Sequence, residues 1–364
     1  MWEQTTRLEH NRLIFAEEFD SFLPKRILDF HIHVFNRGVV REDAPYSCGG
    51  HPILQYDADD LKRDLDDAYP GRETLAVCFG MPVVGYDSAL NNRYIGEMCD
   101  NKRFFGLRLL DLPIDTPSAL HRDLASGRFV GVKPYPDYVL KADMNAVEIP
   151  EMLPDWVMGP VNERGLLVML HIPRKGRLAD PLNQRQIVEL CTRYPKAQIV
   201  LAHVGRAYYL KNAMGNLDAL KGLPNLYYDL AMVNQWEVME HLFATVDPKK
   251  VLYATDIPIA LAPGKSVEIN DQYTYVTPAP WALSISDDRG KIRFTGFLYE
   301  ELRAVKKAVE RLRLSRGFVE DLFFGNGVGL LEKVMGTNTD RHGWARTNTD
   351  TKNRMDEKDG KESR

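Results

Sequence analysis

Short apolar runs alternate along the chain with longer segments in which apolar residues recur at helical spacing. Each run is apolar nearly throughout, which is typical of parallel strands whose two faces are both buried. We therefore predict eight strands, over residues 26–35, 74–82, 104–112, 129–136, 166–173, 198–206, 226–233 and 251–259.

The segments between these strands carry the spacing and the end signals of helices. Leu61 and Leu65 lie one helical turn apart and share a face. Thr116 and Asp180 each precede a proline, and a side-chain acceptor followed by proline is typical of a helix N-terminus. Strands that alternate with helices in this way predict an α/β fold, a (β/α)8 TIM barrel. A doubly wound open sheet is the alternative, but no glycine-rich phosphate loop follows the first strand.

Two long segments interrupt the alternation, residues 36–56 and residues 260–297. Both follow the C-terminal ends of strands, where a barrel builds its active site, so we predict lid insertions at that face. Within the second segment, a hairpin is predicted around Asp288–Gly290.

The domain organisation follows from the same pattern. Residues 1–25 form an N-terminal extension, and residues 26–335 form the barrel with its lid at 260–297. Apolar residues become sparse in 336–364, which predicts a disordered tail.

Composition narrows the possible partners. Hydrophobic residues make up 44 % of the 364 residues, charged residues 27 %, and the net charge is −4. This balance argues against nucleic acid or a membrane as a partner. The N-terminus lacks the pattern of a signal peptide, so we expect a cytoplasmic protein. The four cysteines form no CxxC pair, which predicts free buried thiols.

Candidate chemistry begins at the end of the first strand. His31 and His33 alternate along it and therefore share a face, with Asp29 one layer below. Such a pair alone is compatible with a metal site and with two ordinary histidines.

Three further residues end other predicted strands: His171 the fifth, His203 the sixth and Asp256 the eighth. In a barrel these strand ends meet at one mouth. Because polar groups that follow apolar runs are costly without a partner, the convergence predicts a metal site. Zn²⁺ suits imidazole and carboxylate ligands, and Mn²⁺ is a credible substitute.

These five positions, in barrel order, resemble the amidohydrolase superfamily, specifically the amidohydrolase-related (amidohydrolase 2) group of metal-dependent TIM-barrel hydrolases and decarboxylases. Residues 321–331 also resemble the closing Gly-Asn-Ala-x-x-Leu segment of the group, with Gly327 in place of Ala. The resemblance implies that His31, His33 and Asp256 bind a divalent cation and that His171 is a further ligand. It implies for His203 either a second metal or polarisation of the substrate and proton transfer.

Lys133, near the end of the fourth strand, has two interpretations. Some superfamily members carry a carboxylated lysine there that bridges two metals. Unmodified, its ammonium could pair with a substrate carboxylate or with an oxygen of a ligand. We favour a mononuclear site with an unmodified lysine.

Three arginines near strand ends, Arg108, Arg174 and Arg206, are candidates to bind the substrate together with Lys133. Arginine binds planar carboxylates through a fork of donors, which favours an anionic organic substrate. The alternative is that each arginine pairs with a carboxylate of a loop. Tyr273, Tyr275 and Trp281 could line the substrate site or pack the insertion against the barrel.

Three functions remain open. The first is hydrolysis of a lactone, amide or related carbonyl compound by metal-activated water, with Asp256 as general acid and base and His203 stabilising the oxyanion. The second is metal-dependent, non-oxidative decarboxylation of an aromatic or unsaturated acid. The third is a binding protein that has lost catalysis, which the intact residue set disfavours. We slightly favour hydrolysis and expect a homo-oligomer, a dimer, with a small carboxylate as substrate.

Overall fold

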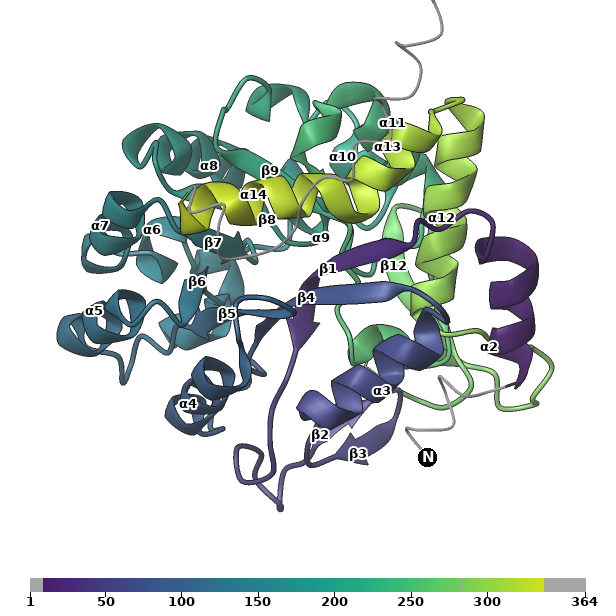
Figure 1. The fold of residues 1–364 in the computed structure, drawn as a ribbon, viewed down its shortest axis with the longest axis horizontal. Coiled ribbons are helices and arrows are strands. Elements are labelled where there is room, and N and C mark those ends of the chain that lie inside the picture. The colour runs from purple at the N-terminus through teal and green to yellow at the C-terminus, as the bar shows by residue number, and fades with distance from the viewer. Residues whose placement is uncertain (1–8, 283, 337–364) are drawn as a thin grey trace, which may run out of the picture.

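The computed structural model describes residues 9–282 and 284–336 and contains an eight-stranded parallel sheet (Figure 1). Each strand lies beside the next one along the chain, in the order β1-β4-β5-β6-β7-β8-β9-β10. The strands are β1 Arg26–His33, β4 Glu73–Phe79, β5 Phe104–Leu109, β6 Phe129–Lys133, β7 Leu167–Leu170, β8 Gln198–Leu201, β9 Leu226–Asp229 and β10 Val251–Leu252. All eight predicted strands are present, and seven of them end at least three residues before the predicted C-terminal boundary.

The sheet curves until its first and last strands meet. The backbone N–H of Phe30 donates to the carbonyl of Tyr253 at 3.0 Å, and that of Asp256 donates to His31 at 2.9 Å. A third hydrogen bond joins the N–H of His33 to the carbonyl of Ile257 at 2.7 Å. These bonds bring the last strand and its following loop against β1, so the barrel prediction is confirmed over the open sheet.

Helices follow the barrel strands and cover the outside of the sheet (Figure 1). Thr116 and Asp180 accept hydrogen bonds from backbone N–H groups at the starts of α5 and α8, as predicted. The α-helices that follow the first strand are α3 Ala58–Ala68, α4 Ser88–Met98, α5 Pro117–Ala125, α6 Ile149–Met152, α7 Asp155–Arg164, α8 Pro181–Arg193, α10 Leu210–Ala213, α11 Trp236–Thr245, α12 Phe297–Arg311, α13 Arg316–Glu320 and α14 Asn326–Met335. The short segment α9, His203–Arg206, is a left-handed turn. A π-helical turn, η8 Asp321–Gly325, joins α13 to α14.

Asp29 links the two ends of the sheet below the mouth of the barrel. It is fully buried, and its carboxylate accepts hydrogen bonds from the backbone N–H of His31 and of Thr255, both at 3.1 Å. The Thr255 hydroxyl donates a third at 2.5 Å. Burial raises the pKa of Asp29 to about 7, although these donors oppose the shift.

The described part of the N-terminal extension packs against α12. Helix α2 (Glu9–Ile14) and the π-helical turn η1 (Phe15–Phe19) lie beside α12 in Figure 1. Phe19 is buried with its ring 5.4 Å from that of Tyr299, and Glu18 pairs with Arg303 at 2.6 Å. The predicted disordered tail, apart from Gly336, lies outside the described residues.

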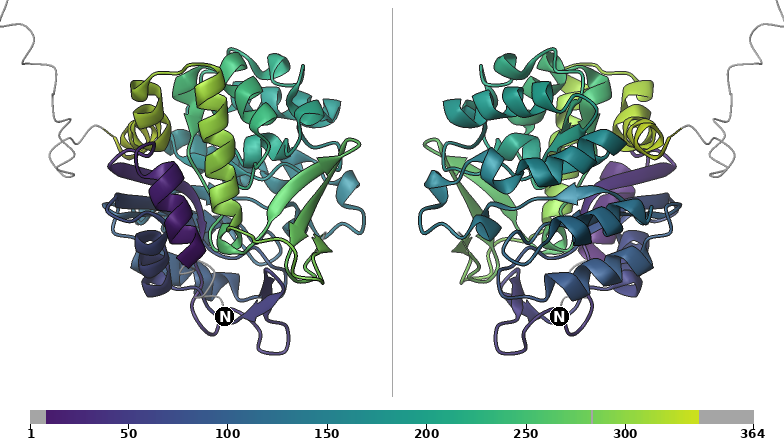
Figure 2. Two further views of the ribbon diagram at one scale, coloured as in Figure 1. Left: turned by 90° about the vertical axis from the view of Figure 1, so that its right-hand side faces the viewer. Right: turned by 90° about the vertical axis from the view of Figure 1, so that its left-hand side faces the viewer.

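The segment after β10 contains a small sheet of its own, visible at one side of the barrel in Figure 2. Its antiparallel hairpin joins β11 Lys265–Ile269 to β12 Gln272–Thr277, and β13 Ser284–Ser286 pairs in parallel with β12. The hairpin predicted around Asp288–Gly290 is therefore wrong. The tight turn falls instead at Asn270 and Asp271, which both adopt the positive φ that two-residue hairpins need.

This small sheet is attached to the first long loop. Residues 36–56 contain a two-stranded hairpin, β2 Tyr46–Cys48 and β3 His51–Ile53. The indole N–H of Trp281 donates to the carbonyl of Ser47 at 3.1 Å. The two insertions predicted to cover the mouth are thus in direct contact with each other.

Two predictions from composition have structural counterparts. All four cysteines are free and buried, as expected. Among the described residues, no helix is both long and apolar enough to cross a membrane.

Gly131 in β6 provides a test of the packing between strands. A methyl group at this position would overlap the carbonyl oxygen of Leu167 in β7, an atom that cannot move without disturbing the sheet. We expect Gly131→Ala to lower the free energy of unfolding by about 1–3 kcal/mol, measured by urea denaturation.

Gly159→Ala is the matched control, because Gly159 lies inside α7 with no atom within 4 Å of the added methyl. It should leave stability unchanged or raise it by up to about 1 kcal/mol. Equal effects of the two substitutions would contradict the proposed crowding between β6 and β7.

Candidate metal centre

The two histidines of β1 face the last strand of the barrel. His31 and His33 are buried, with exposed fractions of 0 % and 2 %. Their Nε2 atoms lie 3.4 and 3.1 Å from the Oδ1 atom of Asp256. The alternation of side chains along β1 and the closure of the barrel together produce this approach, as the sequence predicted.

His203 joins the same cluster from across the barrel. The rings of His31 and His203 lie 4.9 Å apart. One ligand atom each from His31, His203 and Asp256 lie within 4.8 Å of one another, so these three residues could hold a metal ion. Each of them is buried, which makes a set of uncompensated polar groups costly.

The Nδ1 atoms of these imidazoles all have acceptors. His31 Nδ1 lies 2.9 Å from a carboxylate oxygen of Asp229, His33 Nδ1 lies 3.1 Å from the carbonyl of Gly80, and His203 Nδ1 lies 2.8 Å from the carbonyl of Ala231. A carbonyl oxygen can only accept, so a neutral ring bonded to one carries its hydrogen on Nδ1. The Nε2 lone pairs are then free, and those of His31 and His33 face the Asp256 carboxylate.

Protonation of the cluster follows from burial and charge. Burial lowers the pKa of His31 and His171 well below the usual range, and it lowers that of His203 as well. Burial alone would raise the pKa of Asp256, but positive charge on His31 and His33 and a hydrogen bond from His33 outweigh burial and lower that pKa, so a proton between Asp256 and these rings has the same effect as a bound cation would have. Neutral imidazoles beside an ionised carboxylate are the protonation states that bind divalent cations.

Backbone strain gathers at the same end of the barrel. Asp256 and His203 adopt positive φ angles of 74° and 56°, and the left-handed turn continues through Val204 and Arg206. Each such residue costs about 1–3 kcal/mol and persists only where the surroundings require it. This turn also explains why β8 stops at Leu201, five residues before its predicted end.

Asp229, at the end of β9, belongs to the cluster but was missed by the sequence analysis. One carboxylate oxygen accepts from His31 Nδ1, and the other accepts from the backbone N–H of His203 at 2.6 Å and of Ala231 at 3.2 Å. The sequence pattern that identified His171 and His203, a polar residue at the end of an apolar strand, also holds for Asp229.

Two further predicted residues lie close to these histidines. The ammonium of Lys133 is fully buried, has no hydrogen-bond partner, and lies 4.6 Å from the centre of the Phe79 ring. Burial lowers its pKa to about 8. The ring of His171 is 5.5 Å from that of His203 and stacks at 4.6 Å on Tyr135, while its Nδ1 atom is buried without a partner.

The fold agrees with comparisons to known proteins. A model of the amidohydrolase family matches residues 6–279. The chain belongs to the amidohydrolase family. The predicted resemblance is therefore confirmed at the level of the family, while the sequences of curated proteins give no match to this amidohydrolase.

Solved structures share its fold at low identity. An amidohydrolase from Burkholderia multivorans with bound zinc is 16 % identical, with a TM-score of 0.54 and coverage of 84 % of this chain and 98 % of its own. A 4-oxalomesaconate hydratase from Rhodopseudomonas palustris is 16 % identical, with a TM-score of 0.51 and coverage of 85 % and 96 %. A probable 2-pyrone-4,6-dicarboxylic acid hydrolase from Acinetobacter baumannii is 15 % identical, with a TM-score of 0.50 and coverage of 84 % and 98 %.

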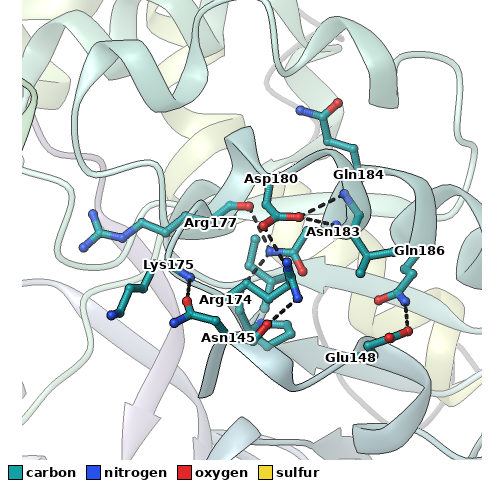
Figure 3. A network of polar contacts seen from close by, with 12 residues as sticks. Asn145, Glu148, Arg174, Lys175, Arg177, Asp180, Asn183, Gln184 and Gln186 are labelled. Carbon is teal, nitrogen blue, oxygen red and sulfur yellow. Dashed lines mark hydrogen bonds and ion pairs between the residues drawn. The ribbon is translucent and has the colours of Figure 1, made fainter. Parts of the chain in front are cut away.

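Two of the three arginines predicted to bind substrate are engaged elsewhere in this amidohydrolase. Arg108 forms a two-pronged ion pair with Asp115, at 2.6 and 2.9 Å, and a third bond with Asp123 at 2.6 Å. It therefore joins β5 to α5 and the loop before it. Arg174 pairs with Asp180 at 2.9 Å and donates to the carbonyl of Asn145, as Figure 3 shows.

Arg206, in contrast, lies near the cluster. Its positive charge lowers the pKa of His171, and only burial lowers that pKa more. Its Nη1 donates to the carbonyls of Ile172 and Arg174 at 3.1 and 3.3 Å. For Arg108 and Arg174 the alternative interpretation, pairing with a carboxylate of the protein, is the one that the structure supports.

Asp229→Asn tests how the His31 tautomer is set. Two backbone N–H groups require an acceptor at Oδ1, so the amide nitrogen of the variant must face His31 Nδ1. We expect His31 to change from the Nδ1–H to the Nε2–H tautomer, measured by ¹⁵N NMR of the metal-free, histidine-labelled protein. Asp218→Asn, a change at an exposed carboxylate, is the control. An unchanged His31 tautomer in Asp229→Asn would contradict the assignment.

Proposed function

We propose that this amidohydrolase is a metal-dependent hydrolase that opens a lactone, amide or related carbonyl group in a small carboxylic acid. The observation that carries the proposal is the orientation of three buried imidazoles. Each has its Nδ1 atom within 3.1 Å of a fixed acceptor, so its neutral form carries the hydrogen on Nδ1 and a lone pair on Nε2. Orientation of a ligand histidine by such an acceptor is the usual arrangement around a catalytic metal.

The donor set fits a divalent cation. The Nε2 lone pairs of His31 and His33 approach the Asp256 Oδ1 atom, and acceptors that face one another repel unless a proton or a cation lies between them. His31 Nε2 and Asp256 Oδ1 are both buried without a hydrogen-bond partner. In this proposal His31, His33 and Asp256 hold the cation and His171 is a further ligand.

Zinc is the proposed metal, because imidazole with carboxylate suits it. The Burkholderia multivorans relative with bound zinc is consistent with this choice. Lys133 is proposed to be unmodified and the centre mononuclear. Its buried ammonium, without a partner, is then available to a carboxylate or an oxyanion of the substrate.

When bound, the cation lowers the pKa of water and polarises the substrate carbonyl. Asp256, ionised at neutral pH, accepts the proton of the attacking water and returns it to the leaving oxygen or nitrogen. The barrel wall and the two contacting insertions restrict the access of bulk water to this carboxylate.

Of the roles that the sequence analysis gave His203, this proposal keeps metal binding and proton transfer and changes how the oxyanion is stabilised. Its Nδ1 hydrogen is directed to the carbonyl of Ala231, so the Nε2 atom that remains carries a lone pair. A neutral His203 cannot donate to an oxyanion from Nε2. We therefore assign it either ligation of the metal or transient acceptance of the water proton at Nε2; in the second case the imidazolium stabilises negative charge on the substrate and hands the proton to Asp256 for the leaving group.

Metal analysis tests the centre directly. We expect about one equivalent of zinc per purified chain, and less than a tenth of that in Asp256→Asn and in His31→Ala, measured by plasma mass spectrometry. His121→Ala, at an exposed position of α5, should keep the wild-type content. Two equivalents per chain would contradict the mononuclear proposal, and equal content in all variants would contradict the ligand assignment.

Activity measurements test the reaction. In a screen of lactones and hydroxy-aromatic acids, we expect ring opening that a chelator removes and zinc restores. His203→Gln should lower kcat by about 10²–10⁴-fold, because the proton acceptor is lost. His121→Ala again serves as the control. Release of CO₂ without uptake of water would replace hydrolysis by decarboxylation, and full activity in His203→Gln would contradict the proton-acceptor role.

A further inference from the structure

One arginine near the mouth of the barrel has no anionic partner. Arg177 lies in the loop between β7 and α8, in a short 3-10 turn over Arg177–Ala179. Among the described residues, no carboxylate forms an ion pair with it, and its Nη1 atom is buried without a hydrogen-bond partner. Arg108 and Arg174 pair with aspartates, so Arg177 differs from both of them.

Hydrogen bonds in the loop between β7 and α8 hold the main chain of Arg177 but do not involve its side chain. The Asn183 side chain donates to the Arg177 carbonyl at 2.9 Å, and Asp180 holds Arg174 in the same loop. Figure 3 shows the Arg177 side chain running away from the Arg174–Asp180 pair. The backbone of Arg177 itself adopts a left-handed conformation, with φ of 56°. A fixed backbone of this kind reduces the entropy lost when the guanidinium binds a ligand.

Two tyrosine rings hold the guanidinium. Its central carbon lies 5.1 Å from the ring centre of Tyr208 and 5.4 Å from that of Tyr273. The two rings stack on each other at 4.4 Å, and Tyr208 lies 5.6 Å from the ring of His203. Tyr208 therefore contacts both Arg177 and His203.

The tyrosines come from different parts of the chain. Tyr208 follows the left-handed turn after β8, whereas Tyr273 lies on β12 of the inserted sheet. Ring contacts continue from Tyr273 to Tyr275 at 5.2 Å and from Tyr275 to Trp281 at 5.4 Å. The aromatic surface that presents Arg177 thus joins the barrel to its lid.

We propose that Arg177 binds a carboxylate of the substrate that is not the reacting group. The charge of a guanidinium over aromatic faces is only partly compensated, and its fork of donors matches a planar carboxylate. Because Tyr208 contacts both Arg177 and His203, a planar acid that lies against this ring can present a carboxylate to Arg177 and its reacting carbonyl to the candidate centre. This proposal rests on the proposed function, because it takes His203 as the reacting end of the site.

Direct binding measurements test the proposal without any turnover. The probe is isophthalate, a planar benzene dicarboxylate, added to the zinc-loaded full-length protein in a calorimeter. We expect Arg177→Met to weaken isophthalate binding by about tenfold to a hundredfold, since a charge-assisted pair is lost. Dimethyl isophthalate, which lacks the charge, should bind the wild type and the variant equally.

The control is Arg311→Met, which removes an exposed guanidinium that lies 4.5 Å from the Trp236 ring and pairs with Glu240 at 2.8 Å. It should leave isophthalate binding unchanged. Equal binding of isophthalate by the wild type and Arg177→Met, or no binding by the wild type, overturns the proposal. A loss of the same size for the dimethyl ester overturns it as well, because Arg177 would then act only by packing the lid.

The proposed hydrolysis and the proposed carboxylate site can be contradicted independently of each other. If no lactone or amide is turned over but isophthalate binding depends on Arg177, the proposed hydrolysis is wrong and the carboxylate site remains. If turnover is found and isophthalate binding does not depend on Arg177, the hydrolase remains and the carboxylate site is wrong.

Discussion

The carboxylate of Asp229 is the contact on which the geometry of the candidate centre depends. It joins the side chain of His31 in β1 to the backbone of His203 after β8 and to the turn after its own strand β9. Because its two oxygens face different donors, it sets the tautomer of one histidine and the backbone position of another. The free lone pairs in the cluster are a consequence of these acceptors as much as of the histidines themselves.

Barrel closure supplies the second constraint. Asp256 approaches His31 and His33 only because the loop after β10 hydrogen-bonds to β1. Asp29 holds the same junction from below through Thr255. The positive φ angles of Asp256 and His203 show that the chain adopts costly conformations where the site is assembled. Tight bonding of the neighbouring backbone makes these conformations persist.

The two inserted segments, residues 36–56 and 260–297, contact each other and the surroundings of His203. The sheet of β11, β12 and β13 contacts the β2–β3 hairpin through Trp281, and its Tyr273 stacks on Tyr208 beside His203. The inserted sheet therefore contributes a side chain to the surroundings of His203. Variation in such a segment can change which acids are accepted while the metal-binding residues stay the same.

Much of this protein could be predicted from its sequence, because strand periodicity and the polar residues at strand ends are local signals. All eight strands, and the meeting of His31, His33, His203 and Asp256, follow from alternation along β1 and from the rule that parallel strand ends share one mouth. The strand predicted over residues 198–206 was too long because the left-handed turn at His203 leaves no distinct pattern in the sequence.

Only the tertiary structure decided which polar groups are paired. The sequence analysis named Arg108 and Arg174, and not Arg177, as candidates to bind the substrate, yet the first two meet aspartates brought near by folding. Asp229 likewise gains its importance from a histidine 198 residues away. Periodicity depends on the local geometry of the backbone, whereas hydrogen bonding and charge pairing depend on distances through space that no short stretch of sequence determines.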